Sequence, residues 1–136
     1  MNFMIEIEGK RIYFNPDDVV DALLAKKITD RILIKSSLYI EDIALNFGVQ
    51  KEEIADPVPF KIARLAMVYA LMMTALENSR MASDGSQDGA DAYELKRRVF
   101  AEELKQIEAQ LSADTFSNGQ SSIKMTAPFA VPILRG

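Results

Sequence analysis

Residues 60–78 read FKIARLAMVYALMMTALEN, and this stretch decides the fold that the sequence predicts. From Ile62 to Leu76 the apolar side chains occupy nearly every angle around a helix, and not one stripe. Such a helix must be buried on several sides. In a chain of 136 residues this leaves two interpretations open. The helix, predicted over 60–79, is either the centre of a monomeric bundle or completes its burial against another subunit.

A second helix is predicted before this stretch, over residues 29–47. Thr29 can cap its first turn, apolar residues recur at helical spacing, and Gly48 ends the run. Residues 31–35 alone could form a strand, but the apolar stripe continues unbroken beyond them and favours the helix. Prolines within residues 56–59 then predict an extended connector to the central helix.

A charged helix is predicted after the central one, over residues 91–111. Its heptad seam consists of Tyr93, Phe100, Leu104, Ile107 and Leu111. Leu95 and Val99 point away from this seam, which makes them candidates for a contact with a neighbouring subunit. Two exposed apolar side chains are also ordinary for a monomer, so the pattern leaves both interpretations open.

The N-terminal part predicts a β-hairpin and a short helix. Residues 3–14 hold two β-rich runs around a turn at Gly9-Lys10. Asn15 can cap a helix and Pro16 suits its first position, so a helix is predicted over 16–26. The apolar face of this helix would consist of Val19, Val20, Leu23 and Leu24.

Residues 112–136 predict an extended C-terminal arm. Pro128 and Pro132 exclude a helix or a central strand there, yet the segment is too apolar for an ordinary disordered tail. The arm could pack on its own domain or lie on a neighbour. Its candidate interface residues are Phe129, Val131, Ile133, Leu134 and Arg135. The predicted fold is therefore mainly α, a small helical bundle over 1–111 with an N-terminal hairpin and an extended arm.

The composition excludes much chemistry. The chain has no cysteine and no histidine, so it lacks zinc-thiolate sites, thiol nucleophiles and imidazole bases. Its acids are scattered or adjacent, and adjacent acids on a helix point in different directions. The polar loop at 83–89 lacks the regular ligand spacing of a calcium loop. We therefore expect neither an enzyme nor a bound metal or cofactor.

Charge and hydropathy indicate the compartment. The net charge of −4 disfavours specific nucleic-acid binding, because no dense basic stripe is present. The first six residues lack the basic and apolar regions of a signal peptide. The longest apolar stretch contains Arg64 and is shorter than the roughly 20 residues of a membrane span. We expect a soluble protein made in the cytosol, without membrane contact.

The order of these elements resembles the small head–tail connector proteins, also called adaptor or head-completion proteins, of tailed bacteriophages and prophages. Those chains are acidic and helical and are of about this size. The resemblance is carried by the helix at Ile32–Phe47, the connector Asp56-Pro57-Val58-Pro59 and the apolar helix at Ile62–Leu71. The charged helix at Tyr93–Leu111 and the proline-containing arm complete it.

The resemblance implies a virion component of the neck, assembled in the host cytoplasm. It implies a homo-oligomeric ring, commonly of twelve subunits, that docks on the portal protein and receives a tail-side neck or tail-terminator protein. The arm residues Phe129 to Arg135 would reach the portal or a neighbouring subunit, and DNA would pass through an acidic lumen. The alternative is a small cytosolic partner-binding or regulatory module of bacterial origin.

Overall fold

The computed structural model describes residues 5–81 and 87–117. The strands are β1 (Ile5–Ile7) and β2 (Lys10–Ile12), and two 3-10 turns are η1 (Pro16–Asp18) and η2 (Lys51–Glu53). The α-helices are α1 (Ala22–Ala25), α2 (Asp30–Asn46), α3 (Phe60–Met81), α4 (Gln87–Glu108) and α5 (Ala113–Ser117). The predicted fold class, mainly helical with a short antiparallel hairpin near the N-terminus, is confirmed.

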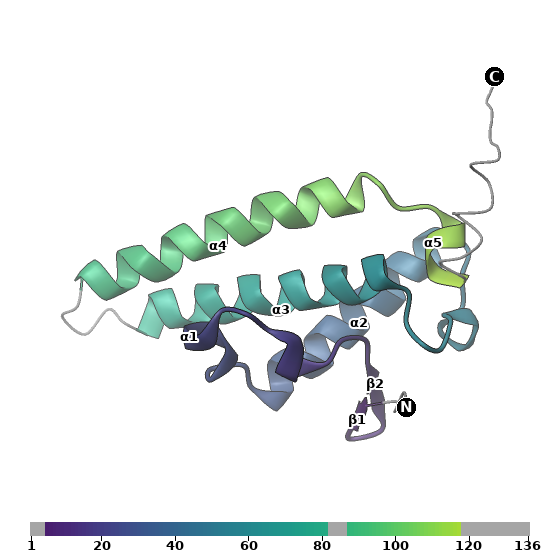
Figure 1. Cartoon of the computed structure of the whole chain (residues 1–136), viewed down its shortest axis with the longest axis horizontal. Helices are drawn as coiled ribbons and strands as arrows, with labels where there is room; N and C mark the ends of the chain where they lie inside the picture. The colour runs from purple at the N-terminus through teal and green to yellow at the C-terminus, as the bar shows by residue number, and fades with distance from the viewer. Residues whose placement is uncertain (1–4, 82–86, 118–136) are drawn as a thin grey trace.

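The apolar helix α3 lies at the centre of the molecule. α4 runs along it in the opposite direction, α2 packs against it, and α1 and α5 each contact part of it (Figure 1). Every residue from 61 to 79 is buried or half-buried, and Ile62, Leu65 and Val68 have no exposed surface. Over residues 61–79 the chain alone therefore covers this helix, which agrees with the interpretation of a central bundle helix.

The N-terminal hairpin has the shortest possible loop. Ile7 pairs with Lys10, so only Glu8 and Gly9 connect the strands. Both have positive φ, 52° and 82°, as a type I′ turn requires. Ile12, at the end of β2, is buried, and β2 packs against α2. The hairpin is thus held to the bundle through both strands, since β1 also contacts α2 and its residues Ile5 and Ile7 pack against the core.

The helix predicted at 16–26 is wrong as a continuous element. η1 ends at Asp18, and Val19 adopts an extended backbone with φ −71° and ψ 122°. Asp21 then caps the separate helix α1, because its side chain accepts from the Leu24 N–H at 3.0 Å. The predicted apolar face breaks up with the helix: Leu24 is buried, but Val20 is 92% exposed.

The other helices differ from the prediction mainly at their ends. Thr29 caps α2 by accepting from the Ile32 N–H, and Gly48 follows its end with φ 79°. α4 begins four residues before the predicted position 91 and ends three residues before 111. The extended arm predicted from residue 112 is wrong at its start, because Ala113–Ser117 forms α5. Phe116 has no exposed surface, and its burial against the bundle stabilises this helix.

Candidate functional site

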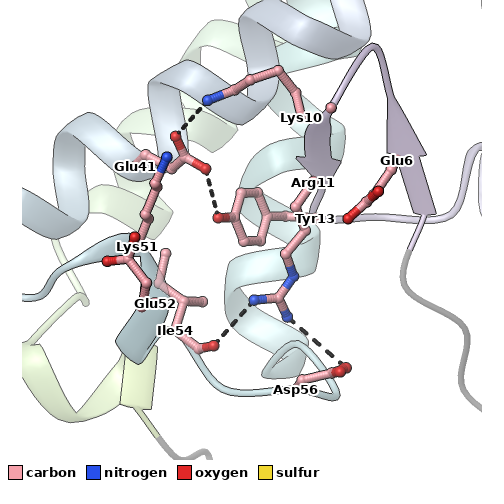
Figure 2. A pocket seen from close by; sticks show the side chains of 10 residues that line it. Glu6, Lys10, Arg11, Tyr13, Glu41, Lys51, Glu52, Ile54 and Asp56 are labelled. Atoms are coloured by element: carbon pink, nitrogen blue, oxygen red, sulfur yellow. Dashed lines mark hydrogen bonds and ion pairs between the residues drawn. The ribbon is translucent and has the colours of Figure 1, made fainter.

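The structure places a polar pocket of about 450 Å³ between the hairpin, the middle of α2 and the segment around η2. Three basic and four acidic side chains line it, together with Tyr13 and Ile54 (Figure 2). Sequence reasoning did not identify this pocket, since its walls come from segments about 30 to 45 residues apart. No spacing within one helix or strand connects these segments.

Glu41 of α2 is the acceptor on one wall of the pocket. Lys10 Nζ lies 2.9 Å from one of its carboxylate oxygens, and the Tyr13 hydroxyl donates to the other at 2.9 Å (Figure 2). The Glu41 side chain is only 13% exposed. Burial and the neighbouring carboxylate raise the pKa of Tyr13 well above its usual range. This phenol therefore keeps its proton and keeps donating beyond the pH at which a free tyrosine ionises.

Arg11 is the donor on the opposite wall. Its guanidinium donates to the carbonyl of Ile54 at 3.1 Å and to that of Ala55 at 2.8 Å. Asp56 lies 3.9 Å away, and the guanidinium stands 4.9 Å from the centre of the Tyr13 ring. Arg11 thus fastens β2 to the connector that precedes α3 (Figure 2).

Lys10, Arg11 and Glu41 of this pocket all have partners within the protein. Lys10, Tyr13 and Glu41 form one cluster, and Arg11 binds backbone carbonyls. The arrangement therefore serves to hold the hairpin on the bundle.

Polar contacts outside this pocket also join elements distant in sequence. Asp21, the cap of α1, also accepts from Lys96 of α4 at 2.7 Å. Burial would raise the pKa of Asp21, but Lys96 and the Leu24 N–H together lower it below its usual value. Tyr39 stacks on Tyr69 with ring centres 4.2 Å apart.

Tyr39 also donates to Glu108 near the end of α4. Burial and this carboxylate raise the pKa of Tyr39 above its usual range. Tyr39 therefore links α2 to α4 through its hydroxyl while its ring packs against α3.

Residues 5–81 and 87–117 show neither a cluster of metal-ligating side chains nor a membrane-spanning helix. These residues contain no group of three or more acids that could hold a metal ion. None of the helices described there is long and apolar enough to cross a membrane.

The two candidate interface residues of α4 lie on the surface. Leu95 is 62% exposed and Val99 is 56% exposed, whereas the seam residue Leu104 is buried. Being four residues apart, Leu95 and Val99 share one face of the helix. The arm candidates Phe129, Val131, Ile133, Leu134 and Arg135 lie outside the described residues.

The structure also exposes apolar residues that the sequence did not single out. Phe60, the first residue of α3, is 85% exposed, and Phe47, which follows α2, is 40% exposed. Both stand at helix ends, where the periodicity that separates buried from exposed positions stops. Comparisons with protein-family models, curated proteins and solved structures found no match.

Proposed function

We propose that the protein is a structural assembly subunit, a head–tail connector that forms a ring on the portal of a tailed phage and links the head to the tail. The observation that carries this proposal is the exposed apolar pair Leu95 and Val99 on α4. An exposed apolar pair on a long, well-packed helix suits repeated contact with a neighbouring copy.

The packing of the bundle supports the proposal that the protein is a rigid assembly subunit. α3 is covered by the chain itself, so folding does not depend on a neighbour. The outer face of α4 is then available for assembly, and residues 129–135 supply the proposed contact with the portal or the next subunit. The net charge of −4 suits a ring whose lumen lets DNA pass without binding it.

The test is reconstitution with the portal and neck proteins encoded beside this chain, followed by native mass spectrometry and cryo-electron microscopy. We expect a closed ring with the wild type and loss of the ring with the double variant Leu95→Asp, Val99→Asp. Val20→Asp is the matched control, because Val20 is equally apolar and 92% exposed.

Two outcomes would overturn the proposal. Rings that persist in the double variant would remove the role of the α4 face. A genome context without portal or capsid genes would favour the partner-binding or regulatory module instead.

A further inference from the structure

One end of the bundle carries apolar side chains that the described residues leave partly or largely exposed. α2 ends there, α3 begins there, and α5 lies at the same end and contacts α3 (Figure 1). Leu45 is 52% exposed, Phe47 is 40% exposed and Phe60 is 85% exposed. We call these three residues the end cluster. Large apolar side chains gathered at one end of a small domain are typical of a binding surface.

The chain leaves the described structure at this same end. The Phe116 ring of α5 lies 5.9 Å from the Phe47 ring, centre to centre. The Ala55 N–H donates to the Phe116 carbonyl at 2.9 Å, which fixes the backbone just before Ser117. The described part of the chain therefore ends, at Ser117, at the same end of the bundle as the end cluster.

The sequence of that segment complements this end. Residues 123–134 include Ile123, Met125, Phe129, Val131, Ile133 and Leu134. Residues 118–136 contain no acid and two bases, Lys124 and Arg135, so they carry a charge of +2. Across residues 50–61 and 112–117 there are four acids and two bases, a charge of −2. The segment is apolar, as the end cluster is. Its charge of +2 is opposite in sign to the charge of −2 around that cluster.

We propose that residues 123–134 dock on the end cluster of their own chain and cover Phe47 and Phe60. The intervening residues 118–122, Asn-Gly-Gln-Ser-Ser, span at most about 18 Å when extended, so the segment stays close to this surface. Tethering at this length gives an effective concentration on the order of millimolar, which favours the chain's own segment over one from a second copy. This inference does not rest on the connector function, since it concerns the free protein.

The absence of cysteine in the chain allows a direct test with a single spin label. The variant Ala130→Cys carries the nitroxide, and isotope-labelled protein is observed by nuclear magnetic resonance. We expect the amide signals of Phe47 and Phe60 to lose intensity, and those of Leu95 to keep it. No loss at either phenylalanine would overturn the proposal.

A mixed sample distinguishes the chain's own segment from that of a second copy. Spin-labelled protein without isotopes is added to isotope-labelled wild type. We expect no intensity loss in this sample. The signals of Phe47 and Phe60 could instead lose as much intensity in the mixed sample as in the chain that carries both the spin label and the isotopes. A neighbouring copy would then occupy the surface, and the proposal would fail.

Hydrogen exchange provides a second measurement that does not depend on the label. Truncation after Ser117 should speed amide exchange around Phe47 about tenfold, because a docked segment slows opening of the surface beneath it. Phe60→Ser should speed exchange at residues 123–134 in the full chain, and the exposed control Val20→Ser should not. Unchanged exchange in both the truncated chain and Phe60→Ser would overturn the proposal.

Discussion

Arg11 and Ala55 join three distant parts of the chain. The Arg11 guanidinium donates to the Ala55 carbonyl at 2.8 Å, and the N–H of Ala55 donates to the Phe116 carbonyl at 2.9 Å. One connector residue thus binds the N-terminal hairpin on one side and α5 on the other. The position of the hairpin and the position of the chain at Ser117 are therefore coupled.

The first prediction concerns this coupling. Arg11→Met keeps the apolar stem but removes the donors to two carbonyls, so we expect a loss of about 2–3 kcal/mol in the free energy of unfolding. Urea unfolding measures it. Arg31→Met is the matched control: that side chain is 58% exposed in its ion pair with Glu77, and it should cost less than about 1 kcal/mol. Equal losses would contradict the role of Arg11.

The second prediction concerns the cap of α1. Asp21→Ala removes both the cap on Leu24 and the contact with Lys96, so we expect a loss of about 1–2 kcal/mol. Lys96→Met leaves the cap in place and should cost less. The two variants are compared by thermal unfolding at neutral pH, and a larger loss in Lys96→Met would contradict this order.

Asp21 also gives the protein a pH dependence on the acid side. Because its pKa is lower in the folded than in the unfolded state, its contribution is present above the unfolded pKa, about 4. The contribution disappears as the pH falls through the folded value. Stability measured between pH 5 and pH 2 should therefore fall less in Asp21→Asn than in the wild type.

The third prediction concerns alkaline pH. The pKa values of Tyr13 and Tyr39 are raised by folding, so their contribution is complete below the unfolded pKa of about 10. Above it, each tyrosine lowers the free energy of unfolding progressively as the pH rises towards its folded pKa. Tyr13→Phe and Tyr39→Phe should each flatten this decline in urea unfolding between pH 9 and pH 11.5. An unchanged slope would contradict the assignment.

The fourth prediction compares neighbouring serines of α2. Both are fully buried, but Ser36 donates to the Leu33 carbonyl, whereas the Ser37 hydroxyl has no hydrogen-bond partner among the described residues. Replacement by alanine adds the same helix propensity at both sites. Ser37→Ala should therefore be more stable than Ser36→Ala by about 1 kcal/mol, as measured by chemical unfolding. A more stable Ser36→Ala would indicate a hidden partner for Ser37.

The fifth prediction separates surface from core on α4. Leu95→Ser and Val99→Ser should change the free energy of unfolding by less than about 0.5 kcal/mol, because both side chains are more than half exposed. Leu104→Ser, at a buried position of the same helix, should cost about 3 kcal/mol or more. Circular dichroism during thermal unfolding measures all three. A large loss in Leu95→Ser would mean that this residue belongs to the core.

Apolar periodicity and capping residues correctly predicted those helices in which a single sequence signal dominates. The uninterrupted stripe and the cap Thr29 located α2, and the all-round apolar run located α3. The same rules failed at 16–26, where Asp21 competes as a second cap, and at 113–117. In that last turn Ser112 and Thr115 bond to each other, and Phe116 is buried against distant residues.

The sequence by itself determined a helical domain with a central apolar helix, because periodicity, caps and prolines act within one or two turns of the chain. It also placed Leu95 and Val99 on the outside of α4. Only the tertiary structure decided that Lys10 and Tyr13 meet at Glu41 and that Arg11 reaches Ala55. Those partners lie 28 to 44 residues apart, and their pairing depends on how whole elements pack.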